Sequence, residues 1–259
     1  MIAVENLKVT FRIEGGEEIN ALRGINFSIE EGEFVTLIGT NGSGKSTVLN
    51  AIAGRTPISD GKILIDGQDV THQPEFQRAK MIGRVFQNPA HGTCANLTVA
   101  ENLRIAALRG STKNLNVGLN ATERERYREL LKGIGMGLDS RLSATAESLS
   151  GGQRQAVTLL MATIVKPRIL LLDEHTAALD PRAAEQLLFM TDELIREHRL
   201  TALMVTHSMS QALSVGSRTI MLDNGRIEMD VSGREREQMK PEDLLDLFGE
   251  LHRRDYLGG

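Results

Sequence analysis

With 259 residues, of which 41% are hydrophobic, the chain can bury a sizeable core as one large domain or as a domain with a subdomain. Its formal net charge of −4 offers no global attraction to nucleic acid, and an aromatic content of 3% without Trp argues against a stacking platform for single strands. The single cysteine, Cys94, excludes an intramolecular disulfide and fits a reducing, cytosolic setting.

The sequence contains no segment that would place the chain in a membrane. No apolar run reaches the roughly 20 residues needed to cross a bilayer. The N-terminal residues MIAVENLKV lack a basic region followed by an apolar one, so they are not a secretory signal. If the chain acts on a membrane, we expect it to do so through partner proteins, and we expect no nucleic-acid partner.

The first part of the chain predicts strands around a glycine-rich loop. Residues 2–11 and 21–29 have strand-like patterns, and residues 34–38 form an apolar run typical of a buried strand. The next nine residues, GTNGSGKST, satisfy the phosphate-loop pattern G-x-x-x-x-G-K-S, and a helix over residues 48–53, stopped by Gly54, follows. Strand, loop and helix form the context that this pattern requires, so we predict a nucleoside triphosphate site.

The phosphate loop has a direct mechanism. Its backbone N–H groups wrap the β-phosphate, Lys45 reaches the β/γ oxygens, and Ser46 offers its hydroxyl to Mg²⁺. A flexible glycine loop without a ligand is the alternative, which the flanking strand and helix disfavour. The predicted nucleotide-binding residues of the loop are Gly39, Asn41, Gly42, Ser43, Gly44, Lys45, Ser46 and Thr47.

The middle of the chain is helical in pattern. Thr98 with Glu101, and Thr122 with Glu125, have the spacing of capping boxes that open helices. No convincing strand interrupts these patterns. We therefore expect residues 90–165 to be a helical insertion between two halves of an α/β core.

Residues 149–153 read LSGGQ, a polar, glycine-rich turn that opens a helix. Ser150 is a good N-cap, and Gly151 and Gly152 let backbone N–H groups approach an anion without side-chain interference. A helix N-terminus with free N–H groups is a natural phosphate site. A plain surface turn is the alternative interpretation.

An acid pair follows shortly afterwards. The apolar run of residues 169–172 has the length of a buried strand and ends in Asp173 and Glu174. Two acids at the carboxyl end of a buried strand suit a Mg²⁺ ligand followed by a base for water. Asp180 and Pro181 then have the pattern of an N-cap and a first helical residue. Each feature alone could be structural, but the LSGGQ turn, the acids and the cap in one run favour a function.

The last part of the chain returns to strands. Residues 201–205 form a buried-strand pattern that ends at Thr206 and His207, and Ser208 with Gln211 caps the next helix. Asn224-Gly225 is a strong hairpin signal. A final amphipathic helix is expected over residues 241–251.

In this order, the phosphate loop, Gln87, LSGGQ, the acid pair and His207 resemble the nucleotide-binding subunits of ATP-binding-cassette (ABC) transporters. The resemblance covers about residues 2–230, and LSGGQ shortly before a strand that ends in Asp-Glu is highly specific to that family. It implies a P-loop NTPase α/β core with an N-terminal antiparallel β subdomain and an inserted helical subdomain. The single ABC domain would comprise a core of residues 1–89 and 166–230, a helical subdomain of residues 90–165 and a C-terminal helix in residues 231–259.

The resemblance also implies roles for residues that the patterns alone leave open. Phe11 matches an aromatic residue that stacks on adenine, although Phe11 could instead belong to the core. Gln87, which by its position alone could be an exposed loop residue, matches the loop that links the core to the helical subdomain and meets water and Mg²⁺. Asp173 matches the Mg²⁺ ligand, Glu174 the catalytic base and His207 the switch histidine near the γ-phosphate.

A second set of residues matches groups that contact the nucleotide held by another subunit, which implies a head-to-tail homodimer with ATP and Mg²⁺ in composite sites. These residues are Ser150 and Gly152; Gly151, Gln153 and Asp180 are further predicted nucleotide-binding residues. One departure is His175, which stands where the family usually has Pro; it could tune the base, lie behind the site or contact the dimer partner.

We therefore expect an ATPase subunit that drives a separate membrane permease. The sequence DEHTAALD of residues 173–180 resembles that of a subgroup of bacterial importer ATPases. These are thought to work with an extracytoplasmic binding protein for amino-acid-like substrates. The alternatives are an ABC ATPase outside transport, as in DNA repair or translation, and a non-enzymatic binding module. The first alternative is disfavoured by the sequence of this chain. DNA-repair members carry a long inserted coiled coil, which is not seen here, and translation members usually carry two cassettes, whereas one is seen here. The second is disfavoured by the presence of Lys45, Asp173, Glu174 and His207 together.

Overall fold

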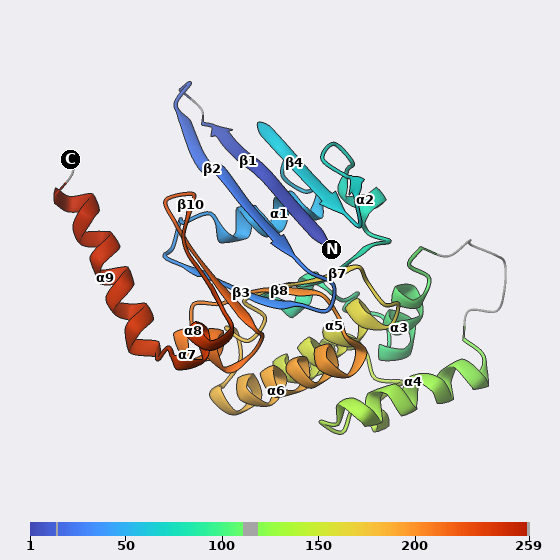
Figure 1. Cartoon of the computed structure of the whole chain (residues 1–259). Coiled ribbons are helices and arrows are strands. Elements are labelled where there is room, and N and C mark those ends of the chain that lie inside the picture. Colours follow the sequence, from blue (N-terminus) through green and yellow to red (C-terminus); the bar gives the residue numbers. More distant parts are fainter. Residues whose placement is uncertain (14, 111–118, 258–259) are drawn as a thin grey trace. The chain divides into compact units, whose positions relative to one another are not determined.

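The computed structural model describes residues 1–13, 15–110 and 119–257, which form two compact units (Figure 1). The first unit contains Met1–Arg78 and His198–Gly259, and the second contains Ala79–Glu197. No helix within the described ranges combines the length and the apolar character that a membrane span needs. The finer domain boundaries expected from the sequence stay predictions.

An antiparallel sheet opens the first unit. Its strands, in sheet order, are β2 (Glu18–Ile29), β1 (Ile2–Arg12), β4 (Asp60–Ile65) and β5 (Gln68–Asp69). Along β1 the side chains of Ile2, Val4, Leu7 and Val9 are buried, as expected when one face of a sheet packs on the core. The expected N-terminal antiparallel β subdomain is confirmed, and β2 starts three residues earlier than predicted.

A second group of strands in the first unit carries the phosphate loop. These strands are β3 (Phe34–Gly39), β8 (Ala202–Val205), β9 (Arg218–Asp223) and β10 (Arg226–Ser232). β3 runs parallel to both β8 and β9, and β10 is antiparallel to β9. All six residues of β3 are buried, which explains its largely apolar sequence. Asn224 and Gly225 both have positive φ, 43° and 75°, so the predicted hairpin turn is confirmed.

Helices complete the first unit. They are α1 (Lys45–Ala53), α2 (Glu75–Arg78), α7 (Met209–Ser214), α8 (Gly233–Gln238) and α9 (Pro241–Leu257). Helix α9 continues six residues beyond the predicted end, and residues 258–259 of the expected C-terminal segment lie outside the described residues. Leu244 and Phe248 of α9 are buried in a cluster with Ile38, Ala212 and Met221. The last helix is therefore docked on the first unit.

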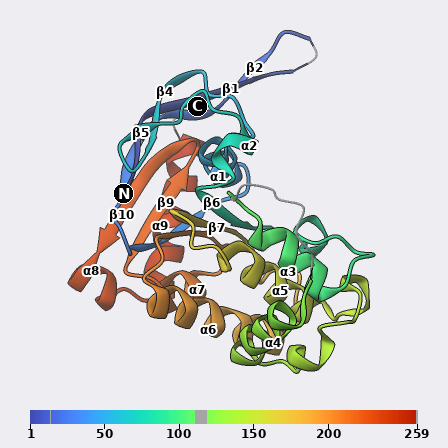
Figure 2. The same cartoon turned by 90° about the vertical axis from the view of Figure 1, so that its right-hand side faces the viewer.

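Within its described residues, the second unit contains one parallel strand pair, four α-helices and three 3₁₀ turns. Its elements are β6 (Ile82–Val85), β7 (Ile169–Asp173), α3 (Val99–Ala107), α4 (Ala121–Ile134), α5 (Gly151–Thr163), α6 (Pro181–His198, in this unit up to Glu197) and the 3₁₀ turns Pro89–His91, Leu138–Arg141 and Ala146–Ser148. Helices α3, α4 and α5, green to yellow in Figure 2, pack against one another. The expected helical insertion is confirmed.

The two capping boxes predicted for this region have different outcomes. Thr98 caps α3 with Glu101, as predicted. The pair Thr122 and Glu125 is wrong, because α4 starts earlier, at Ala121. There Asn120 adopts an extended backbone, accepts from the Glu123 backbone N–H at 2.8 Å and donates its own backbone N–H to the Glu123 carboxylate. Asn120 with Glu123 has the same capping-box spacing as Thr122 with Glu125, and Asn is the better N-cap of the two residue types.

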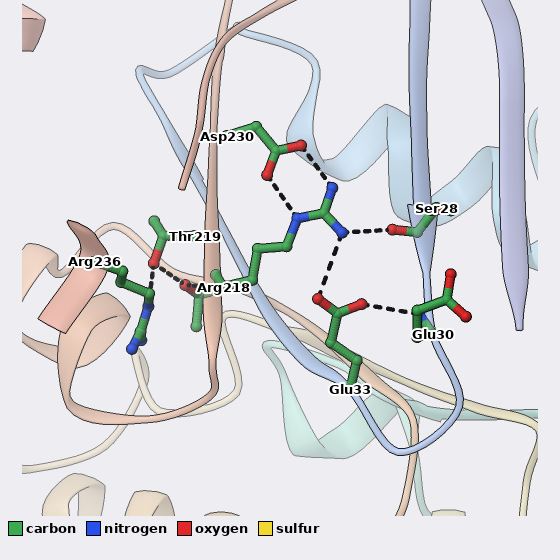
Figure 3. A network of polar contacts seen from close by, with 8 residues as sticks. Ser28, Glu30, Glu33, Arg218, Thr219, Asp230 and Arg236 are labelled. Carbon is green, nitrogen blue, oxygen red and sulfur yellow. Dashed lines mark hydrogen bonds and ion pairs between the residues drawn. The ribbon is translucent and has the colours of Figure 1, made fainter. Parts of the chain in front are cut away.

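A polar network ties the strands of the first unit together (Figure 3). The guanidinium of Arg218 on β9 makes two bonds of 2.6 Å to the carboxylate of Asp230 on β10, and it also donates to the Ser28 carbonyl at 2.8 Å. Glu33, 3.4 Å from the same guanidinium, in turn accepts from the Glu30 backbone N–H. The hydrogen bonds to Asp230 raise the pKa of Arg218, against the opposing effect of burial.

We expect Arg218→Met to lower the free energy of unfolding by about 2–3 kcal/mol, because it leaves two carboxylates and a carbonyl without their shared donor. Urea denaturation measures this loss. Arg234→Met is the matched control, because Arg234 is exposed on α8 and should change stability by less than about 0.5 kcal/mol. Equal stability of the two variants would contradict the importance of the network.

Candidate functional site

The phosphate loop needs glycine at two positions for steric reasons. A Cβ on Gly39 would lie 2.2 Å from the Leu222 carbonyl oxygen, which no side chain tolerates. Gly44 has φ +106°, and a Cβ there would lie 2.7 Å from the Ala21 carbonyl oxygen. The glycines that the sequence pattern singled out therefore allow the loop to lie closely against β2 and β9.

The loop holds polar groups that suit a phosphate. The Lys45 side chain is buried, and its Nζ donates to the carbonyls of Gly39 at 2.9 Å and Thr40 at 2.8 Å. The Ser43 hydroxyl is also buried and has no hydrogen-bond partner among the described residues. Gly44, the N-cap of α1, provides no side chain to cap that helix. A buried free hydroxyl and an uncapped helix N-terminus beside an ammonium group fit a phosphate.

Other groups of the phosphate loop face solvent, and the loop is also held by a contact with Asp223. Asn41, Gly42 and Ser46 are exposed, and Thr47 is half-buried. Asp223, at the end of β9, accepts from the Thr40 hydroxyl at 3.2 Å. The sequence predicts only the hairpin turn at the next two residues, Asn224 and Gly225, and carries no signal for this contact with the phosphate loop.

Phe11 and His207 lie in the first unit. Phe11 is 44% exposed and faces Ile19 on the neighbouring strand, so the interpretation of Phe11 as a core residue is wrong. His207 is exposed and follows Thr206, whose backbone N–H donates to Leu37 of β3. Because β3 and β8 are parallel, His207 emerges at the same sheet edge as the phosphate loop.

The second unit brings Gln87 and Glu174 together. Strands β6 and β7 are parallel, so both residues follow carboxyl ends at one edge. The side-chain amide of Gln87 donates to a Glu174 carboxylate oxygen at 3.2 Å. Glu174 also has a positive φ of 46°, which costs a non-glycine residue about 1–2 kcal/mol. Backbone strain of this kind is concentrated at functional sites in folded proteins.

Asp173 has a cationic neighbour that the sequence did not indicate. The Arg84 guanidinium lies 3.2 Å from an Asp173 carboxylate oxygen, and both side chains are largely buried. The same guanidinium lies over the Phe86 ring, 4.7 Å from its centroid. Within the described ranges no three or more His, Cys, Asp or Glu residues gather into a metal cage. The single carboxylate fits Mg²⁺ bound chiefly through phosphate oxygens and water.

The LSGGQ turn forms the predicted helix start. The Ser150 hydroxyl accepts from the Gln153 backbone N–H at 3.3 Å, and the Gln153 side-chain oxygen accepts from the Ser150 N–H at 3.2 Å. The Gln153 amide group also donates to the Met136 carbonyl at 3.1 Å. The predicted N-cap is confirmed, and it is a full capping box.

The two glycines of the turn have a packing role in addition to any anion contact. A Cβ on Gly151 would lie 3.3 Å from the Leu179 side chain, and one on Gly152 would lie 3.2 Å from the Ala183 Cβ. The start of α5 therefore packs on the segment that begins α6. There Asp180 accepts from the Ala183 backbone N–H at 3.0 Å, which confirms the predicted N-cap.

The site geometry can be compared with known proteins. A family model described as ABC transporter matches residues 22–177, more than half of the chain. This chain belongs to the ABC transporter family. It is 41% identical over 248 residues to a tyrosine transport ATP-binding protein of Clostridioides difficile (strain R20291), which covers 96% of this chain and 98% of the relative.

A longer relative and a solved structure agree with this result. The sulfate/thiosulfate import ATP-binding protein CysA of Synechocystis sp. (strain ATCC 27184 / PCC 6803 / Kazusa) is 38% identical over 212 residues, which cover 82% of this chain and 56% of CysA. The ATP-binding cassette MJ0796, solved as a dimer in a post-hydrolysis state with ADP and Pi, superposes with a TM-score of 0.77 at 31% identity, over 90% of this chain and 98% of MJ0796. This ABC protein is an ATPase with the P-loop NTPase fold.

In this ABC ATPase, His175 next to the acid pair is buried, with 1% of its surface exposed. Its Nε2 lies 3.1 Å from the Thr191 hydroxyl, which itself donates to the Leu187 carbonyl at 2.7 Å. Because that hydroxyl proton is used, Nε2 of His175 is the donor to Thr191. Burial lowers the pKa of His175 to about 4, so the ring is neutral at pH 7.

We expect His175 to make the free energy of unfolding of the ABC ATPase, measured without metal ions, decrease in acid. Since its pKa falls from 6.5 to about 4 on folding, the unfolded chain binds the extra proton first. The contribution of neutral His175 to the free energy of unfolding is fully present above pH 6.5. It is lost as the pH falls toward 4, by about 2–3 kcal/mol at pH 4.5. Urea unfolding at pH 7.5 and 4.5 should show a smaller acid loss for His175→Gln than for the wild type. Equal losses would contradict this origin.

Proposed function

We propose that this ABC ATPase energises a separate membrane permease at the cytoplasmic face of the plasma membrane, and that the assembly imports an amino-acid-like solute. The observation that carries the proposal is the similarity, over nearly the full length of both chains, to a tyrosine transport ATP-binding protein. An extracytoplasmic binding protein would deliver the solute to the permease. The alternative, an ABC ATPase outside transport, is supported by no comparable observation.

In this proposal the phosphate loop holds the β- and γ-phosphates of ATP. Lys45 supplies the positive charge, and the N–H groups at the start of α1 surround the phosphate oxygens. Phe11, exposed on β1, would stack on adenine. Ser46, Gln87 and Asp173 provide oxygen atoms of the kind that Mg²⁺ prefers. When bound, Mg²⁺ supplies charge neutralisation for the phosphates.

Glu174 is the proposed base. Its carboxylate takes the proton of the attacking water, while the bond from the Gln87 amide orients that carboxylate. His207, exposed after β8, would donate a hydrogen bond toward the γ-phosphate. Gln87 also precedes the helical insertion, and in this proposal its loop couples the ATP site to the permease.

Two copies of the chain are proposed to share each ATP. Ser150, Gly151, Gly152 and Gln153 offer a helix N-terminus without an acidic side chain, which suits the charge of a nucleotide held by the partner copy. Asp180 lies on the adjoining segment. ATP would then hold the dimer together, and loss of the γ-phosphate contacts would loosen it.

We expect Glu174→Gln to bind ATP but to hydrolyse it at least about 100-fold more slowly, because the water loses its base. The variant should form an ATP-dependent dimer in size-exclusion chromatography, and cells that carry it should lose uptake of labelled tyrosine. Glu193→Gln changes an exposed residue on α6 and is the control. It should behave as the wild type in the hydrolysis, chromatography and uptake assays. Normal turnover in Glu174→Gln would exclude Glu174 as the base. Uptake of every labelled amino acid at the wild-type rate would exclude the proposed transport.

A mixing experiment tests the sharing of sites. Lys45→Ala and Ser150→Arg should each be inactive, the first in the phosphate loop and the second at the LSGGQ turn. In a mixed dimer both lesions fall in one composite site, and the other site is intact. With random pairing about half of the dimers are mixed, and each mixed dimer has one intact site of two. We therefore expect mixing to recover about a quarter of the wild-type ATPase activity per chain if one intact site turns over alone. Full activity of the isolated monomer, independent of protein concentration, would disprove shared sites.

A further inference from the structure

Gln155 of helix α5 makes two bonds that none of the recognised motifs explains. Its side chain is fully buried. The amide nitrogen donates to the carbonyl of Phe86 at 2.7 Å and to the carbonyl of His175 at 2.9 Å. All three residues belong to the second unit, so one NH₂ group joins α5, the end of β6 and the segment after β7.

The two carbonyls flank the pair that is central to the proposed chemistry. Phe86 directly precedes Gln87, and His175 directly follows Glu174. The Gln87 amide in turn donates to the Glu174 carboxylate at 3.2 Å. The Gln155 amide therefore holds both main chains from which this side-chain contact is made.

The need for this side chain does not come from packing alone. Its neighbours Ala156, Leu159 and Leu160 on α5 are buried and apolar. The Gln155 side-chain oxygen is buried without a hydrogen-bond partner among the described residues. An apolar residue of similar length would avoid that desolvation penalty. The two donated bonds are thus what the buried amide contributes.

We propose that Gln155 is a positioning residue that links the LSGGQ helix to the catalytic base. The inference rests on the proposed function of Glu174 and goes beyond it. Gln155 lies five residues after Ser150 in one continuous helix, about 7.5 Å along its axis. A shift of the helix start, where the partner's nucleotide is proposed to bind, moves the carbonyls beside Gln87 and Glu174.

The backbone at Glu174 makes this link effective. A non-glycine residue at positive φ persists only where the surrounding structure holds it. The Glu174 carbonyl accepts from the Ala177 backbone N–H at 2.9 Å, and the bond from Gln155 to the His175 carbonyl restrains the next residue of this turn. Without the Gln155 bonds, the carboxylate would lose its fixed direction toward the water.

The test is Gln155→Met, which keeps the length of the side chain and removes both donors. In the full chain we expect kcat for ATP to fall about 10- to 100-fold, because the base is misplaced, while KM changes less than about twofold. Thr158→Val is the matched control. Thr158 is buried on the same helix, and among the described residues its hydroxyl bonds only to the Arg154 carbonyl of α5. The control should keep the wild-type kcat.

A double variant separates positioning from a general structural loss. If Gln155 acts through Glu174, adding Gln155→Met to Glu174→Gln should lower the residual single-turnover rate by less than about twofold. A further loss as large as in the wild-type background would overturn the proposal. Should Gln155→Met fail to fold, Gln155→Asn, whose shorter amide cannot reach both carbonyls, replaces it. Wild-type kcat in either folded variant also overturns the proposal, whereas an inactive wild type would instead refute the proposed function.

Discussion

Four of the segments with predicted site residues in this ABC ATPase begin where a buried parallel strand ends. In the first unit, β3 leads into the phosphate loop and β8 into His207. In the second unit, β6 leads to Gln87 and β7 to the acid pair. Within each unit, parallel strands bring their carboxyl ends to one edge, so residues far apart in sequence lie close together there. This constraint explains why the apolar runs and the polar residues after them recur together along the chain.

The loops at these edges are held by contacts that have no motif of their own. Asp223 braces the phosphate loop through Thr40, and Arg84 is paired with Asp173. Gln155 anchors the main chain on both sides of the Gln87–Glu174 contact. A site that must act on a phosphate needs fixed dipoles and charges, since groups that reorganise during the reaction stabilise less charge. The supporting residues provide that rigidity.

Several residues serve packing as well as their proposed role. Gly151 and Gly152 allow α5 to approach Leu179 and Ala183, so an anion contact is not the sole reason for glycine there. His175, placed where the family usually has Pro, is buried, neutral and bonded to α6 through Thr191. This arrangement favours a place behind the site over direct tuning of the base by charge, because a neutral ring adds no charge beside Glu174.

The sequence by itself determined the fold class, the family, most of the elements and the helix starts at Thr98, Ser150 and Asp180, because these depend on local spacing and on strand-length apolar runs. The predicted start of α4 is wrong, because Thr122 with Glu125 has the same spacing as Asn120 with Glu123, although Asn is the better N-cap. The partners of Arg84, Gln155 and His175 were decided by the tertiary structure alone. A polar side chain within an apolar run does not reveal which distant carbonyl or carboxylate it will reach, because that depends on how strands and helices pack.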